Sequence, residues 1–291
     1  MDRKQIEEKV TDGIIAQLEK GVAPWKRPWA SAGMAEPISL STKRPYRGIN
    51  WLILELERLE RGFSSPTWAT FNQIKQRGGK VLKGEKGTAI VFWKKITVEK
   101  DEEIKQIPML RYYTVFNLDQ VEGIEDPFAA KASGDPVDAP QAAAAILASY
   151  SDGPEIIHRR QDGAFYRPSE DRITLPELDQ FESPEGYAST LFHELIHSTG
   201  HKDRLDRFAG DETFGCEGYA KEELVAEIGA GMLRAIAQVG GAQEDEQNAA
   251  YVASWLKKLK DDRSLLIGAA QQAQKAIDRI LGTEWPKKEE A

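Results

Sequence analysis

Apolar residues recur with a period close to 3.6 along several stretches of the first half of the chain, a pattern typical of amphipathic helices. It predicts helices over residues 6–18, 50–61 and 70–77, and glycine follows soon after the first and third of them. Residues 88–98 and 110–118 are rich in β-branched and aromatic side chains, which predicts two strands. We therefore expect an α+β arrangement in this half.

The second half has mainly helical patterns. Helices are expected over residues 141–150, 184–200, 218–238, 245–260 and 262–281, with short strands over 155–160 and 164–175. Between the halves, residues 127–140 (PFAAKASGDPVDAP) lack apolar periodicity and have the composition of a linker. The predicted fold class is α+β with two domains. An α+β domain covers residues 1–126, a linker covers 127–140, and a mainly helical domain with a small β-sheet covers 141–291.

Length and composition agree with two globular domains. The 291 residues exceed the usual size of one domain, about 100–200 residues. A composition of 41% hydrophobic and 30% charged residues excludes wholesale disorder. No run of about 18 apolar residues occurs and residues 1–20 lack a signal-peptide core, so we expect neither a membrane span nor export. Cys216 is the single cysteine, which fits a reducing cytoplasm.

The net charge of −8 argues against a nucleic-acid partner until its distribution is considered. Residues 20–95 carry 15 Lys and Arg against five acidic residues, a net charge of +10, which leaves −18 for the rest of the chain. Five of the seven tryptophans lie in the same stretch. Proteins that bind single-stranded nucleic acid combine these two kinds of side chain, because cations follow the phosphates while flat rings stack on unpaired bases.

The candidate DNA contacts are aromatic, basic and amide side chains of this stretch: Trp25, Lys26, Arg27, Trp29, Lys43, Arg44, Tyr46, Arg47, Asn50, Trp68, Phe71, Lys83, Lys86 and Lys94. The alternative is structural, since most tryptophans fill cores and most charge runs are solvated faces. For Trp51 and Trp93, which have apolar neighbours, the core is the default expectation.

The segment LFHELIHSTGH (191–201) predicts a metal site. His193 and His197 are four residues apart, so on a helix they lie one turn apart on one face and can share one cation. Glu194 follows the first histidine, where it can accept a proton from water that the metal activates. Chance matches to this short pattern occur, but three of the four histidines lie within nine positions here.

A third ligand is expected from the helix predicted over GYAKEELVAEIGA (218–230). We favour Glu223 as that ligand and Glu227, one turn on, as the acceptor for the second N–H of a ligating histidine. Two alternatives stay open. Glu222 is adjacent to Glu223, so the register could be shifted by one residue, and His201 could supply the third ligand instead.

Four further residues near these motifs have structural explanations. His158 is isolated on a predicted strand, and Cys216 is interpreted as a lone core or loop thiol. Tyr187 and Tyr219 flank the two metal-site helices, where they could polarise a substrate carbonyl, although core packing is the simpler interpretation.

With both halves considered, the chain resembles the ArdC family of antirestriction proteins, which conjugative plasmids and related mobile elements carry. The resemblance covers nearly the full length. It is carried by YRGIN (46–50), the Trp68…Phe71…Gln73 spacing, KGEKG (83–87), YYTVFNLDQ (112–120), AFYRPSEDRITLP (164–176), the H-E-x-x-H segment and KEELVAEIGA (221–230).

The resemblance implies an N-terminal domain that binds single-stranded DNA, joined to a zincin-like metallopeptidase domain similar to the Spartan-type DNA–protein crosslink proteases. It implies that the protein shields incoming DNA from host restriction enzymes in the cytoplasm. The family's metal ligands carry over to His193, His197 and Glu223, with zinc, or another divalent metal such as manganese, as the cofactor. The expected partners are single-stranded DNA and an unidentified protein substrate, for which DNA-bound proteins are candidates.

Two other functions fit the same residues. One is a non-enzymatic protein that coats single-stranded DNA and uses its metal only for stability. The other is a soluble metallopeptidase without a role in DNA binding. The resemblance itself leaves open whether the peptidase domain cleaves a protein and whether protection depends on cleavage.

Overall fold

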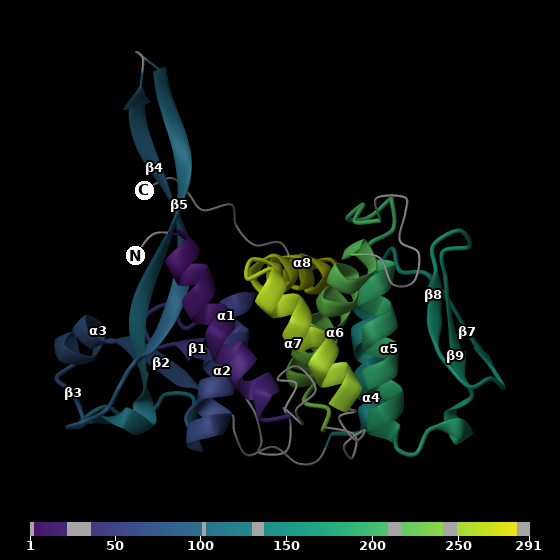
Figure 1. Ribbon diagram of the computed structural model, residues 1–291. Coiled ribbons are helices and arrows are strands. Elements are labelled where there is room, and N and C mark those ends of the chain that lie inside the picture. Colours follow the sequence, from purple (N-terminus) through teal and green to yellow (C-terminus); the bar gives the residue numbers. More distant parts are fainter. Residues whose placement is uncertain are drawn as a thin grey trace. The chain divides into compact units, whose positions relative to one another are not determined.

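A computed structural model describes residues 3–21, 36–100, 103–129, 137–208, 217–240 and 249–283 (Figure 1). Contacts between residues divide the chain into two units. Among the described residues, the first unit contains 3–21, 36–129 except 101 and 102, and Ala249–Ile267, whereas the second contains 137–208, 217–240 and 268–283. Both contain helices and strands, and helices prevail in the second, so the predicted fold class is confirmed.

A four-stranded sheet of order β1-β2-β5-β4 organises the first unit. Its strands are β1 (Ile38–Ser39), β2 (Thr67–Thr70), β4 (Thr88–Lys100) and β5 (Glu103–Asn117). β1 and β2 are parallel, and the other neighbours are antiparallel. β5 pairs with β2 only through its last three residues but with β4 from Val115 to Glu103, so β4 and β5 extend as a two-stranded ribbon (Figure 1). β3 (Lys80–Val81) and β6 (Val121–Glu122) form a separate antiparallel pair.

The helices of the first unit are α1 (Arg3–Glu19), α2 (Ile49–Arg61), α3 (Phe71–Gln76) and α7 (Ala249–Asp261). α2 ends at Gly62, whose φ of 68° suits a residue without a side chain. α3 begins with a capping box in which Thr70 and Gln73 satisfy each other's backbone N–H groups. A 3-10 turn, η2 (Leu118–Gln120), follows β5 and begins with the same arrangement between Asn117 and Gln120.

Core residues cover both faces of the sheet. On one face Trp68, Ile90 and Val115 are buried with Leu54 of α2. On the other, Ala69 is buried with Ile74 of α3, Leu40 and Leu118. Trp68 and Ala69 are neighbours on β2, so their side chains point to opposite faces.

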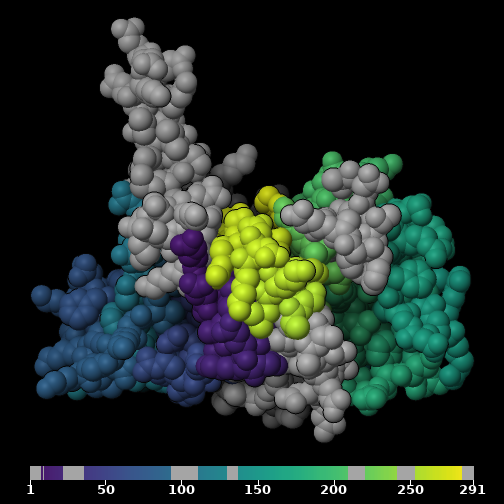
Figure 2. All heavy atoms as spheres, viewed as in Figure 1, coloured from purple at the N-terminus to yellow at the C-terminus, as the bar shows by residue number. Residues whose placement is uncertain are grey.

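The grouping of helix α7 differs from the predicted division of the chain. Residues 249–267 group with the first unit, whereas the predicted domain boundaries place them in the domain 141–291. α1 and α7 lie side by side (Figure 2). Thr11 donates to the carbonyl of Arg263 over 2.7 Å, and the side chains of Asp12 and Arg263 form an ion pair. The α7 side chains Trp255 and Leu259 are buried. The pattern predicted the helix but not its partner, because an amphipathic helix does not specify the apolar surface that covers it.

The second unit packs a small sheet and a set of helices. The sheet has the order β7-β9-β8, with β7 (Glu155–Arg159) parallel and β8 (Phe165–Arg167) antiparallel to β9 (Arg172–Pro176). Its helices are α4 (Ala139–Ser149), α5 (Pro184–Ser198), α6 (Glu217–Ala237) and α8 (Leu265–Ile280), and a 3-10 turn, η4 (Leu178–Gln180), precedes α5. α5 contacts α4, α6 and the strands β8 and β9.

Candidate functional site

Helix α5 carries the two histidines of the H-E-x-x-H segment, as the sequence predicts. Ser183 caps its start by accepting from the backbone N–H of Gly186 over 3.1 Å, and Pro184 occupies the first turn. A buried side formed by Leu191, Phe192, Leu195 and Ile196 orients the helix. His193 and His197 remain half-buried, one turn apart.

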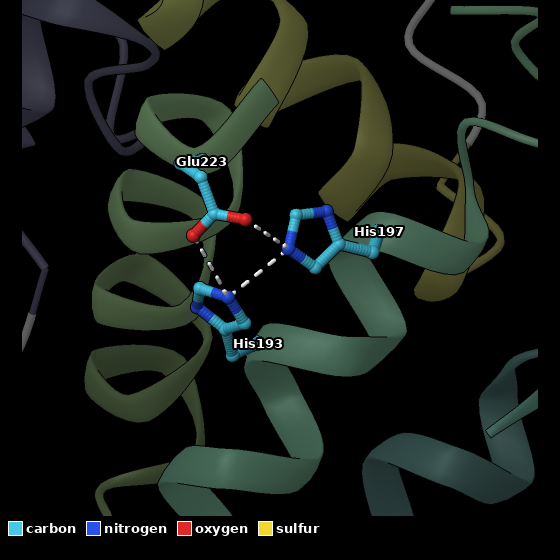
Figure 3. A group of neighbouring side chains, drawn as sticks. All are labelled: His193, His197 and Glu223. Carbon is cyan, nitrogen blue, oxygen red and sulfur yellow. Dashed lines mark hydrogen bonds and ion pairs between the residues drawn. The ribbon is translucent and has the colours of Figure 1, made fainter. Parts of the chain in front are cut away.

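Helix α6 brings Glu223 against the same face (Figure 3). A Cβ on Gly229 would lie 2.7 Å from Cδ1 of Ile196, so α5 and α6 approach closely only because residue 229 is glycine. The two Glu223 carboxylate oxygens lie 3.7 Å from Nε2 of His193 and 3.4 Å from Nε2 of His197, and the two imidazole nitrogens are 3.0 Å apart. One donor atom from each of the three residues lies within 4.8 Å of the others.

Glu222 contacts the other nitrogen of His197, a role that the sequence analysis gave to Glu227. Its carboxylate lies 3.2 Å from Nδ1 of His197, so the imidazole presents Nε2 to His193 and Glu223. Glu227 lies close enough to Arg234 to oppose the lowering of the Arg234 pKa by burial. Its predicted role as acceptor for a ligating histidine stays a prediction.

Arg207 holds Glu222 in place. Its Nε and Nη2 donate to the two carboxylate oxygens over 2.9 and 2.6 Å, and it also donates to Thr199 Oγ1 and to the carbonyl of Ile196. Both side chains of the pair are more than nine-tenths buried. Arg207 could not be predicted from the sequence because it lies in a loop, where no periodicity links it to α6.

The electrostatics of the site follow from this network. Burial lowers the pKa of His197, but its contacts with Glu222, Glu223 and Glu194 outweigh burial and raise the pKa to about 10. Burial raises the pKa of Glu222, but Arg207 and His197 outweigh it and hold the pKa below its usual value. Burial also raises the pKa of Glu194, although His197 and the backbone N–H of Tyr166 partly oppose this shift.

The donor set fits a divalent cation. Two imidazoles and one carboxylate are ligands that zinc accepts, and manganese also binds imidazole and carboxylate. Without a cation, the carboxylates of Glu222 and Glu223 favour a proton on His197, which is why its pKa is raised. A cation displaces such protons and satisfies the same atoms.

The remaining candidates of this unit lie apart from these three residues. His201 is not among the side chains grouped around Glu223 in the described chain, and its Nδ1 lies 3.5 Å from Asp203. His158 lies 3.2 Å from the hydroxyl of Tyr187 and stacks on its ring, which agrees with structural roles for both. Cys216 and the side chain of Tyr219 lie outside the described residues.

Two predicted DNA contacts in the first unit are wrong. Trp68 has no exposed surface, so its ring offers no face to a base. Asn50 is buried and both ends of its amide bond to Val91, accepting from the N–H of Val91 over 2.8 Å and donating to the carbonyl of Val91 over 2.7 Å. It thereby satisfies the backbone of β4. Trp51 is buried, as expected of a core residue.

Other predicted DNA contacts remain accessible. The exposed ones are Lys43, Arg44, Phe71, Lys83 and Lys86, while Tyr46 and Arg47 are half-buried. Burial raises the pKa of Tyr46 to about 12. Trp25, Lys26, Arg27, Trp29 and the side chains of Trp93 and Lys94 lie outside the described residues. Within the described ranges, helices that combine the length and apolarity needed to cross a bilayer are absent.

Family models match two consecutive stretches of the chain. Residues 4–116 match the N-terminal domain of the anti-restriction factor ArdC, and residues 142–272 match a zincin-like metallopeptidase. Crystal structures of the antirestriction protein ArdC from plasmid R388, one metal-free and one Mn(II)-bound, are each 40% identical with a TM-score of 0.78. The similarity covers 94% and 95% of this chain and 96% and 97% of those chains.

Curated relatives extend the comparison. An uncharacterized protein, y4eC of Sinorhizobium fredii, is 33% identical over 94% of this chain and 90% of its own length. Two proteins named DNA primase TraC from Escherichia coli are each 37% identical over 97% of this chain. The chain spans only 27% and 20% of the length of those two relatives.

Proposed function

Because the chain belongs to the ArdC family of antirestriction proteins and carries a zincin-like metallopeptidase domain, we propose that it binds incoming single-stranded DNA of mobile elements and protects that DNA from host restriction. We place DNA binding in the first unit and a metal-dependent peptidase in the second. DNA held by the first unit would raise the effective concentration of DNA-bound proteins at the peptidase site.

The observation that carries the enzymatic part is the convergence of His193, His197 and Glu223 from two helices. We assign these three side chains as ligands of a divalent metal, for which the Mn(II)-bound state of the R388 relative is support. Zinc and manganese are both proposed, since the ligand set suits either. When bound, such a cation supplies a Lewis acid that activates water and polarises a carbonyl group.

Glu194 is proposed as the general base. It is adjacent to His193, is nine-tenths buried, and receives a hydrogen bond from the backbone N–H of Tyr166 on strand β8. Burial raises its pKa, which makes its carboxylate a stronger proton acceptor. The buried carboxylate can thus take a proton from the attacking water and later deliver it to the leaving amine of a cleaved peptide bond.

Metal binding is tested by titrating Mn²⁺ and Zn²⁺ into tag-free protein in a calorimeter. His197→Ala is expected to weaken metal binding by more than about 100-fold. Loss of a residue that only hydrogen-bonds a metal ligand costs about 10–100-fold, and loss of the ligand itself should cost more. His158→Ala is the matched control, since this histidine of the same unit contacts Tyr187 and is not part of the group of three proposed ligands in the described chain. Equal binding by wild type and His197→Ala would remove the metal assignment.

Catalysis is tested with Glu194→Gln in a conjugation assay that transfers a plasmid into restricting and non-restricting recipients. The variant retains metal and DNA but lacks the base, so the proposed mechanism predicts loss of protection. Full protection by Glu194→Gln would instead identify a protein that coats DNA and uses its metal for stability. Binding of labelled single-stranded DNA at several salt concentrations tests the remaining step, and absent binding would leave a peptidase without a role on DNA.

A further inference from the structure

The face of the sheet that buries Trp68 continues past the core along the β4–β5 ribbon. Val115, opposite Thr88, is fully buried, and Ile90 of the next pair on that face is also buried. The residue opposite Ile90 is Tyr113, and the following pair on the same face is Phe92 with Arg111. Tyr113 and Phe92 are 45% and 38% exposed, so this face leaves the core while remaining aromatic.

We call Phe92, Tyr113 and Arg111 the ribbon patch. The rings of Phe92 and Tyr113 meet edge to face with centroids 5.4 Å apart, and Arg111 is exposed opposite Phe92. Most solvent-facing strand positions carry polar side chains, so two adjoining exposed rings on one strand pair are unusual. Two rings and a guanidinium on one face can stack on flat partners and attract anions.

We propose that the ribbon patch is the surface on which unpaired bases of single-stranded DNA stack, with Arg111 beside the phosphate backbone. Charge identifies the partner as an anionic chain, because residues 20–95, which include Phe92, carry a net charge of +10. An apolar protein partner would not require this excess of cations. Duplex DNA hides the faces of its bases, so the patch selects single strands.

This inference rests on the proposed function but is more specific, since it places base stacking on two rings and a phosphate contact on one arginine, none of which was predicted from the sequence as a DNA contact. Tyr112 provides a matched control. It is 43% exposed and adjacent to Tyr113, but it points to the opposite face of the ribbon, opposite Val91. If exposure alone determined DNA contact, Tyr112 and Tyr113 would contribute equally.

The experiment measures the anisotropy of two labelled oligomers of about 16 nucleotides, an oligothymidine and an abasic strand that keeps the phosphates but lacks bases. Tyr113→Ala and Phe92→Ala are each expected to weaken oligothymidine binding by the full chain about 5- to 150-fold and to leave abasic binding unchanged. Tyr113→Phe keeps the ring and should bind as the wild type does. Tyr112→Ala should also retain wild-type affinity.

Arg111→Gln acts through phosphates, so it should weaken binding of both oligomers and reduce the slope of affinity against salt by about 1. Tyr113→Leu keeps an apolar side chain without a flat ring, and thermal melting of each variant verifies folding. Loss of oligothymidine binding by a folded Tyr113→Leu supports stacking.

Three results would overturn the inference. Wild-type affinity in Tyr113→Ala, when the wild type prefers oligothymidine to the abasic strand, would place stacking elsewhere and leave the proposed function intact. A lowered melting temperature of Tyr113→Ala or Phe92→Ala without weakened binding of oligothymidine would show that the ring pair has only a structural role. A changed association state by light scattering, with DNA binding intact, would identify a protein interface. Absent DNA binding by the wild type would instead refute the proposed function itself.

Discussion

In the second unit, His193, His197 and Glu223 converge from two helices, whereas in the first unit Trp68 and Asn50 point into the core and away from any surface that DNA could reach. Both sets of residues were chosen from sequence for their chemistry. A metal needs donor atoms that meet in a partly buried position, and helical spacing brings two of them together. A DNA contact needs exposure, and residue type does not report exposure.

The comparison also separates two uses of buried polar groups. Glu222 and Arg207 are buried as a pair, and their pairing orients His197. Asn50 is buried to satisfy the backbone of β4. The buried carboxylate of Glu222 thus belongs to the proposed site, whereas the buried amide of Asn50 makes a structural bond. The following variants test that distinction, from the largest expected effect to the smallest.

Trp68→Ala should lower the free energy of unfolding by about 3–5 kcal/mol, because it empties a fully buried indole site. Urea unfolding followed by circular dichroism measures the change. Trp68→Phe, which keeps much of the volume, should cost less. A Trp68→Ala protein with unchanged stability and lost DNA affinity would restore Trp68 as a DNA contact and reverse the contrast between the units.

Arg207→Met should weaken the binding of Mn²⁺ or Zn²⁺ about 10–100-fold, because Glu222 loses the partner that fixes it against His197. Calorimetric titration measures the affinity. Arg204→Met is the matched control, since Arg204 is a buried arginine of the same loop whose carboxylate partner is Asp171 and not Glu222. Equal loss of affinity in both variants would show that the loop matters and the contact with Glu222 does not.

Asn50→Ala should lower the free energy of unfolding by about 1–3 kcal/mol, because the N–H and carbonyl of Val91 lose their partner. DNA affinity of the folded variant should equal that of the wild type at every salt concentration. Reduced affinity without reduced stability would contradict the structural role of this amide.

The smallest expected effect is the change in metal affinity produced by one pH unit. The pKa of His197 is raised from 6.5 to about 10 in the metal-free protein, so its contribution to stability is complete below about pH 6.5 and is lost as pH rises towards 10. Metal must displace that proton, so metal affinity should rise by up to about tenfold per pH unit in the same window. Calorimetry in buffers of different ionisation enthalpy detects the released proton, and pH-independent affinity without proton release would contradict the raised pKa.

Most helices and strands follow from local pattern. The helix carrying His193 and His197, the helix of Glu223 and strand β4 lie where the sequence predicts them. Strand β5 was predicted over residues 110–118, but it begins seven residues earlier, at Glu103. Gln73 and Gln120, which belong to the motifs that carry the family resemblance, form capping boxes. Such features are predictable because residues a few positions apart determine them.

Other features could not be predicted because they join residues distant along the chain. The contact between Glu222 and His197 depends on the approach of α5 to α6 at Gly229, and Arg207 reaches that contact from a loop. The grouping of α7 with α1 and the exposure of Tyr113 depend on which surface covers each element.

The sequence by itself determined the spacing of the two histidines, the position of a carboxylate-bearing helix after them, and the concentration of positive charge in the first half. Those properties are local or additive, so they do not depend on how the chain packs. Only the tertiary structure decided that Glu222 orients His197, that Trp68 and Asn50 are buried, and that the aromatic face of β4 and β5 emerges from the core. Burial and contact are properties of the packed chain, because they depend on what lies against each side chain.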